Sequence, residues 1–353
     1  MTFNRKSSRF SYVSLACLLV VVGFAGTFAF RYYRYQTSAY IQNPEVTVDE
    51  AIAVMQAHAL GARNVADWGL LREESLVIAN KKGNEIDLDN ALGYLTEHLE
   101  DGHSFYLSRS QYEAVETRTA SWWWNTSITS PLIEVATVPL VRVNGFISMD
   151  TVESKMASQL LRAQVDIALA MDRCGVIVDL SENGGGNMYP MLMGLLPLLS
   201  EGTLIQFESA SGQMNSVVSE GGAIKYGNAV IMAPLVTPYA RASQKSRVAL
   251  VLSTGTGSSG EMVAIAFKGQ KNVRFFGEPT AGATTGNVPY RLSHGGFLAL
   301  ATSRTWDRVG EKYVGPVQPD EVVKGMRSSV KARQLASQWV TAECKQAETA
   351  KSL

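Results

Sequence analysis

The chain has 353 residues, of which 46% are hydrophobic and 18% charged, so it can form two or three domains and is too apolar to be disordered throughout. Its 32 basic and 32 acidic side chains balance, which removes the electrostatic case for nucleic-acid binding, and three cysteines exclude a disulfide scaffold. The balance is uneven along the chain, because residues 1–36 hold five basic side chains and no acidic one, and the remaining 27 basic side chains face 32 acidic ones.

The N-terminal region contains a candidate membrane anchor. Residues 10–30 are 21 uncharged, largely apolar residues, and about 20 apolar helical residues cross the hydrocarbon core of a bilayer. A cleaved signal peptide is the alternative, but its apolar core is usually about 7–15 residues. Basic residues flank the run, so we expect a single-pass protein whose remainder is extracytoplasmic. The segments expected are a cytoplasmic tail over 1–9, the anchor over 10–30 and a stalk over 31–44.

A small helical unit is expected over residues 45–115. The run from Thr47 to Glu50 fits a capping box, and apolar residues follow it at helical spacing. A second helix is expected over residues 88–99, where leucines recur on one face.

From residue 139 onward, short apolar strands alternate with helical patterns, which predicts βαβ crossovers and an α/β domain with a largely parallel central sheet over residues 116–345. Residues 291–300 are typical of a hairpin, and a polar helix is expected from about residue 328. Two isolated thiols are favoured over one disulfide for Cys174 and Cys344. The other expected elements are strands at 140–149, 175–180, 203–207, 248–252 and 273–276, and helices at 152–171, after 188 and from 260.

Two glycine-rich loops follow expected strands, at the edge where parallel sheets usually bind ligands. The first, residues 181–188, contains three consecutive glycines whose N–H groups can approach a phosphate or the oxyanion of acyl transfer, although a flexible turn explains them equally well. The second contains G-x-G-x-x-G at residues 255–260, the pattern of a dinucleotide-binding loop. It also places Ser258 at a turn into a helix, where a hydroxyl can attack a carbonyl while the N–H of Ser259 faces the developing charge.

A serine nucleophile needs a base, and the chain has four histidines. His58 and His98 fall within helical patterns, and His294 lies in the expected hairpin turn. His103 follows Gly102, which can end a helix, and therefore lies on a loop. His103 is the candidate base.

Five short motifs occur here in the order in which they occur in the tail-specific, or C-terminal processing, serine peptidases, and the chain resembles that family over residues 90–323. The run from Thr256 to Met262 and the glycine run around Gly185 are most similar to nisin-resistance proteins, which are membrane-anchored peptidases that act on a lantibiotic. The resemblance implies the α/β fold of these proteases, related to ClpP and crotonase. The motifs are those at 101–104, 178–186, 256–261, 276–282 and 319–320.

The resemblance also implies the roles of individual residues. Ser258 becomes the nucleophile and His103 the base, with neither metal nor cofactor. The oxyanion hole would use the backbone N–H groups of Gly185, Gly186 and Ser259. The candidate substrate contacts are Asn187, Met188 and Glu261.

The chain departs from the family pattern in three places. Members with a Ser–Lys dyad have a lysine where this chain has residues 281–283, Ala-Gly-Ala, which favours the histidine-based mechanism. Tricorn-type members have a serine and a glutamate where this chain has Gly102 and Tyr313, so the group that orients His103 is unassigned. About 30 residues separate Tyr106 from Pro139, too few for the PDZ domain of many members.

The sequence therefore predicts a membrane-anchored serine endopeptidase that hydrolyses an exported peptide or protein near its C-terminus. Resistance to a nisin-like lantibiotic is a narrower hypothesis. A catalytically inactive peptide-binding homologue is one alternative, and a nucleotide-binding protein that uses the loop at 255–260 is another. No nucleic-acid partner is expected.

Overall fold

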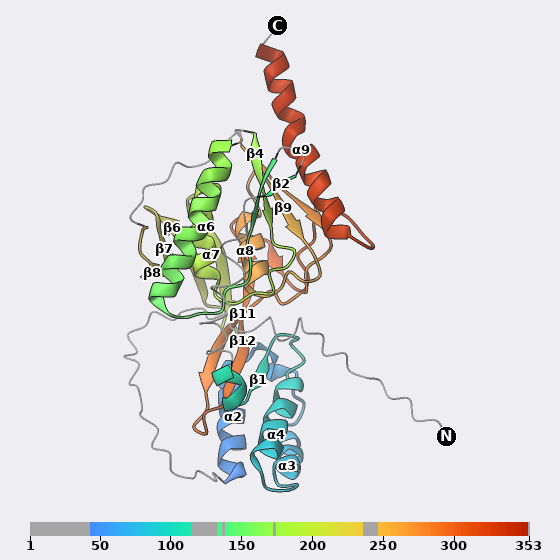
Figure 1. Cartoon of the computed structure of the whole chain (residues 1–353). Helices are drawn as coiled ribbons and strands as arrows, with labels where there is room; N and C mark the ends of the chain where they lie inside the picture. The colour runs from blue at the N-terminus through green and yellow to red at the C-terminus, as the bar shows by residue number, and fades with distance from the viewer. Residues whose placement is uncertain (1–42, 115–132, 136–137, 172–173, 236–245, 352–353) are drawn as a thin grey trace, which may run out of the picture.

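The computed structural model describes residues 43–114, 133–135, 138–171, 174–235 and 246–351 (Figure 1). The predicted cytoplasmic tail, the predicted anchor at 10–30 and nearly all of the predicted stalk lie outside these residues. Within the described ranges, no helix combines the length and the apolar character that a membrane crossing requires.

The helical unit contains α2 (Pro44–His58), the short helix η1 (Leu60–Arg63), α3 (Trp68–Ala79) and α4 (Glu85–Glu97). Helix α2 begins earlier than predicted, because Asn43 caps it with a side chain that accepts the N–H of Glu45, 3.2 Å away. Pro44 follows at the first position, where no N–H is needed. Thr47 therefore lies inside the helix, and the predicted capping box is wrong. Helix α3, which was not predicted, is capped by Asp67.

A mostly parallel sheet forms the centre of the catalytic region, as predicted. Its strands are buried on both faces, and side chains alternate between two cores. In β9, Val248 and Leu250 face one core while Ala249 and Val251 face the other. Among the described strands of this sheet, only β2 and β3 pair in antiparallel fashion. The strand order is β14 (Glu321–Val322), β10 (Val273–Gly277), β9 (Arg247–Leu252), β4 (Gly175–Asp179), β3 (Val138–Arg142) and β2 (Ile133–Val135).

A second, antiparallel sheet corrects the prediction of one largely parallel sheet. In its path β12 neighbours β1 and β5, and β11 and β13 also pair with β12. The sequence indicated only the strand near residue 203 and the hairpin near 291, because the other strands are short or only partly buried. The strands are β1 (Phe105–Leu107), β12 (Phe297–Asp307), β5 (Gly202–Ser209), β6 (Met214–Glu220), β7 (Ala223–Tyr226), β8 (Ala229–Met232), β11 (Thr285–Arg291) and β13 (Lys312–Tyr313).

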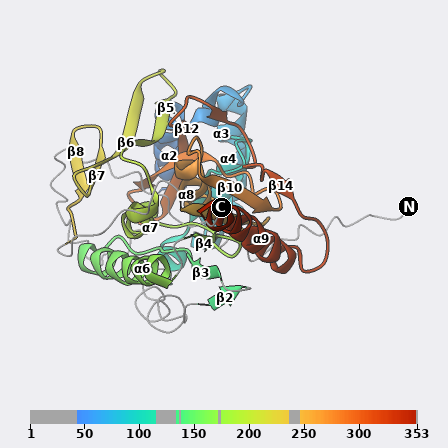
Figure 2. The ribbon, with the colours of Figure 1, turned by 90° about the horizontal axis from the view of Figure 1, so that it is seen from above.

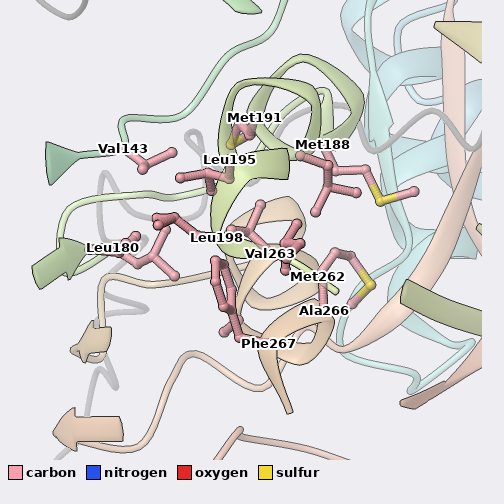
Figure 3. Close-up of a cluster of buried hydrophobic side chains, with 14 of the residues drawn as sticks. Val143, Leu180, Met188, Met191, Leu195, Leu198, Met262, Val263, Ala266 and Phe267 are labelled. Carbon is pink, nitrogen blue, oxygen red and sulfur yellow. The ribbon is translucent and has the colours of Figure 1, made fainter. Parts of the chain in front are cut away.

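Helices fill the space between the two sheets and cover the outer face of the parallel one (Figure 2). Side chains from both sheets and from α6 (Thr151–Met171), α7 (Met188–Leu195), η2 (Leu196–Leu198) and α8 (Ser259–Phe267) form one core. Figure 3 shows the part of this core around α7 and α8. Helix α9 (Ser328–Lys351) packs on the opposite face, where Ala332, Ala336 and Val340 meet β4, β9 and β10.

The helical unit packs on the hairpin formed by β11 and β12, in the lower part of Figure 1. Leu298 and Leu300 of β12 belong to the same apolar core as the buried leucines of α4. The Glu50 carboxylate accepts the N–H and the hydroxyl of Ser293 at 3.0 and 2.6 Å. The packing of the helical unit on this hairpin therefore holds the loop after α4 close to the start of β11.

The cysteine prediction is wrong in one respect. Cys174, directly before β4, is in a disulfide bond rather than an isolated thiol. The side chains of the other two cysteines, Cys17 and Cys344, are not among those that the structure describes.

Candidate active site

The candidate nucleophile lies at the carboxyl end of a central strand. Strand β9 leads into the loop that contains Ser258, and α8 begins at the next residue. Ser258 has φ = 52°, a left-handed conformation that costs a non-glycine residue about 1–3 kcal/mol. A serine held on a strained turn between strand and helix is the arrangement of a nucleophile elbow.

The structure brings His103 to this serine across 155 positions of the chain. The imidazole Nε2 lies 3.1 Å from Ser258 Oγ, within hydrogen-bond distance. The backbone at His103 is fixed by Asp101, whose Oδ1 accepts the N–H groups of His103 and Ser104 at 3.0 and 2.7 Å. Ser258 is fully buried, and His103 is 5% exposed.

Two side chains of β11 hold His103 from the other side. Thr285 Oγ1 lies 2.7 Å from the ring Nδ1, and the Asn287 amide donates to the His103 carbonyl at 2.9 Å. Sequence reasoning missed both residues. No local motif marks them, because they reach His103 only through the packing of the β11–β12 hairpin against the helical unit.

Burial controls the protonation of His103. Loss of water around the ring lowers its pKa from 6.5 to about 4, although the Asp101 charge and a hydrogen bond with the backbone of Thr285 oppose this shift. The ring is therefore neutral at physiological pH and can accept a proton from Ser258.

The three predicted oxyanion donors lie together, but they are not equivalent. A Cβ added to Gly185 would lie 2.8 Å from Ser258 Cβ and 3.2 Å from the Ser259 nitrogen, so this loop passes directly over the nucleophile. The N–H of Gly185, however, donates to Asn183 Oδ1 at 3.0 Å. The N–H groups of Gly186 and Ser259 have no acceptor among the described residues.

Asn183 joins the two glycine-rich loops. Its side chain accepts the N–H of Gly185, its carbonyl accepts the N–H of Gly257 at 2.9 Å, and both groups are fully buried. Its carbonyl also lies 2.4 Å from where a Cβ on Gly260 would be. The glycines of the 255–260 loop therefore allow close packing against protein atoms, which accounts for the G-x-G-x-x-G pattern without a dinucleotide.

Glu261, a predicted substrate contact, is fully buried beneath the nucleophile. One carboxylate oxygen accepts the Ser258 N–H at 2.9 Å, and the other accepts the Gly282 N–H at 2.8 Å and the Thr280 hydroxyl. Burial raises the Glu261 pKa to about 7, opposed by these donors. The contacts described for this carboxylate are all internal.

Asn187 and Met188, the other predicted substrate contacts, are also buried in this structure. Asn187 caps α7 by accepting the Tyr189 N–H at 3.1 Å, and its amide donates to the Ser148 carbonyl at 3.1 Å. Met188 is fully buried among apolar side chains of α7 and α8 (Figure 3). Their role in substrate binding stays a prediction.

The described residues contain no group of three or more histidine, cysteine or acidic side chains that could hold a metal ion. What the geometry supplies is a serine hydroxyl, a neutral imidazole within hydrogen-bond distance and two adjacent backbone donors. These are the components of a serine hydrolase, recognised by geometry and not by chain order.

The family model for peptidase family S41 matches residues 139–323, which are 185 of the 353 residues. The chain therefore belongs to this family, which is a family of serine peptidases, and the resemblance drawn from its sequence motifs is confirmed. Its similarity to a nisin-resistance protein from Lactococcus lactis subsp. lactis is 33% identity over 172 residues. This match covers 48% of the chain and 51% of that protein, so the chain spans about half the length of this curated relative.

Solved structures share the fold. A lipoprotein from Streptococcus agalactiae has a TM-score of 0.68 at 23% identity, covering 88% of this chain and 99% of that one. The photosystem II D1 C-terminal processing protease has a TM-score of 0.50 at 13% identity, covering 83% and 97%. At these identities the likeness establishes the fold alone.

Proposed function

We propose that the chain is a membrane-anchored serine peptidase in which Ser258 is the nucleophile and His103 the general base and acid. The observation that carries this proposal is the 3.1 Å separation of His103 Nε2 from Ser258 Oγ, at the carboxyl end of a central strand. Family membership supplies the class of reaction, and this contact supports the dyad that we propose for it.

The proposed reaction follows from the positions of these groups. His103 Nε2 takes the proton of Ser258 as Oγ bonds to the scissile carbonyl carbon, whose oxygen becomes negative. The N–H groups of Gly186 and Ser259 stabilise that oxygen. The imidazolium then protonates the leaving amine as the C–N bond breaks, and water, activated by the same ring, hydrolyses the acyl-enzyme. Gly185 can contribute a third N–H only if its bond to Asn183 is released.

The proposed location is the outer face of the cell membrane, anchored by residues 10–30. The disulfide at Cys174 supports export, because disulfides persist in oxidising compartments and are rare in the cytosol. The excess of acidic side chains after residue 36 is compatible with a cationic peptide substrate.

The proposed substrate is a peptide cut near its carboxyl end, and specifically a lantibiotic of the nisin type. The name of the Lactococcus relative supports the narrower choice, as do the sequence runs around Ser258 and Gly185 that resemble nisin-resistance proteins. Expression of the chain should protect a nisin-sensitive strain, and mass analysis of the exposed peptide should show a cut near its C-terminus. Protection without any cleavage would contradict a peptidase role.

The dyad is tested by labelling with a fluorophosphonate, which reacts with activated serines. The full chain in detergent should be labelled, Ser258→Ala should not, and Ser211→Ala, in the exposed turn after β5, should be labelled like the wild type. Labelling that persists in Ser258→Ala would remove the nucleophile, and unchanged activity in His103→Ala would remove the base.

A second candidate is an inactive peptide-binding homologue. It is favoured by the complete burial of Ser258 and the absence of a carboxylate at His103 Nδ1 in the described site. This candidate predicts nisin binding by the full chain, with no labelling and no cleavage.

A further inference from the structure

We propose that Thr285 is the positioning residue of the dyad: its hydroxyl orients His103 at the place where a carboxylate stands in Ser-His-Asp sites. This inference rests on the proposed roles of Ser258 and His103. It assigns the third member that the sequence left open.

The proposed mechanism requires one particular tautomer of the ring. For Ser258 to be activated, Nε2 must be the unprotonated nitrogen that receives the hydroxyl proton, 3.1 Å away. The ring hydrogen must then lie on Nδ1, where it needs an acceptor. Thr285 Oγ1, at 2.7 Å from Nδ1, is that acceptor. Without it, the neutral ring is free to adopt the tautomer that carries the hydrogen on Nε2, which cannot accept the serine proton.

Asp101 is the carboxylate that the sequence places beside His103, but its oxygens are used elsewhere. Oδ1 accepts the backbone N–H groups of His103 and Ser104, and Oδ2 accepts the Ser104 hydroxyl at 2.6 Å. Asp101 therefore shapes the loop and contributes its charge, while the described contact to the ring comes from Thr285.

Thr285 is held firmly enough for this task. It is the first residue of β11 and pairs with Arg304 of the long strand β12. The register shifts between Gly286 and Asn287, and Asn287, just past this irregularity, donates to the His103 carbonyl. One strand therefore holds both the ring and the backbone of His103.

A hydroxyl has a different chemical consequence from a carboxylate. It can accept the Nδ1 hydrogen, but it carries no charge to stabilise the imidazolium that forms when Ser258 gives up its proton. Burial lowers the pKa of His103 to about 4, and neither the Asp101 charge nor the backbone of Thr285 reverses that shift.

The test uses the full chain in detergent with Thr285→Val, which keeps the shape and the backbone of Thr285 but removes the side-chain acceptor, and Thr285→Ser, which keeps the hydroxyl. We expect the fluorophosphonate labelling rate to fall about tenfold or more in Thr285→Val and to stay within about threefold of wild type in Thr285→Ser. Thr341→Val in α9 makes the same chemical change far along the chain and should label like wild type.

Two readouts separate positioning from a general structural effect. In ¹⁵N-histidine spectra, with the His103 signals assigned by their loss in His103→Gln, wild type should show the Nδ1–H tautomer and Thr285→Val a mixture. Thr285→Asp should move the acid limb of the labelling rate up by about one pH unit or more, since a carboxylate at Nδ1 raises the histidine pKa.

The outcomes are distinguishable. If Thr285→Val labels at the wild-type rate and keeps the wild-type tautomer, the inference is overturned while the peptidase proposal stands. A larger loss in Asp101→Asn than in Thr285→Val would also overturn it, in favour of Asp101. If wild type is not labelled at all, the proposed function fails, and the histidine spectra alone then decide whether Thr285 sets the tautomer.

Discussion

Gly185→Ala is the substitution that most directly tests the proposed site geometry. Gly185 has φ = 116°, where an alanine is strained, and the new Cβ would lie 2.8 Å from Ser258 Cβ, 3.1 Å from the Gly257 carbonyl oxygen and 3.2 Å from the Ser259 nitrogen. Each of these neighbours belongs to the nucleophile turn. The turn must therefore shift, and it carries both Ser258 and an oxyanion donor.

Gly212→Ala is the matched control. Gly212 has φ = 84° in the turn between β5 and β6, and an added Cβ there meets nothing within 4 Å. Both variants lose about 1–2 kcal/mol from backbone strain. Gly185→Ala should lose about 1–3 kcal/mol more unfolding free energy, because its new Cβ is forced against the nucleophile turn.

The assay has two parts, carried out on the full chain in detergent. Urea unfolding should show the larger loss of unfolding free energy in Gly185→Ala. Fluorophosphonate labelling should fall by about 10²–10³ in Gly185→Ala, the usual effect of losing one oxyanion donor, and stay within about twofold of wild type in Gly212→Ala. Equal stability losses together with equal labelling rates in the two variants would refute the placement of Gly185 over Ser258.

Two further predictions concern charge. The His103 pKa is about 4 in the folded chain and about 6.5 in the unfolded chain, so only the unfolded chain takes up this proton as the pH falls from 6.5 to 4. In urea titrations over that pH range, wild type should therefore lose up to about 3 kcal/mol more unfolding free energy than His103→Gln. Equal losses in the two proteins would contradict the burial of a neutral ring. Arg333→Met should cost about 1–3 kcal/mol, because Asp179, 1% exposed, loses the partner at 2.7 Å and keeps only Arg142, at 3.8 Å, as a described cationic partner. Arg274→Met removes an exposed pair and should cost under about 1 kcal/mol by the same urea measurement.

The parallel half of the fold could be predicted because its signals are local. Strands β4 and β9 are continuous apolar runs, each followed by a glycine-rich loop and a helix, and this order places both loops at one edge of the sheet. The antiparallel sheet was missed because strands such as β6 alternate weakly and β13 has two residues. The register of β12, which pairs with four strands, depends on contacts that no local pattern carries.

The same distinction explains which parts of the site could be found. Ser258 and the Gly185–Gly186 loop follow directly from neighbouring parallel strands, so a motif at each strand end predicts their meeting. Local sequence marks His103 only as a histidine on a loop, and its pairing with Ser258 follows from the resemblance, because its loop belongs to the helical unit and meets Ser258 through the β11–β12 hairpin.

Thr285 is harder to predict from the sequence than His103, because hydroxyl side chains are common and Thr285 lies 182 positions from the ring that it contacts. The segment just before it, residues 281–283, is where Ser–Lys members of the family have their lysine, and here it is small and neutral. The Ala281 N–H donates instead to the Thr256 carbonyl at 2.8 Å, and the Gly282 N–H to Glu261, so this segment supports the nucleophile turn. A base must then come from elsewhere, and the hairpin that follows supplies the hydroxyl that holds it. The proposed positioning residue Thr285 thus follows directly on the segment that has no lysine.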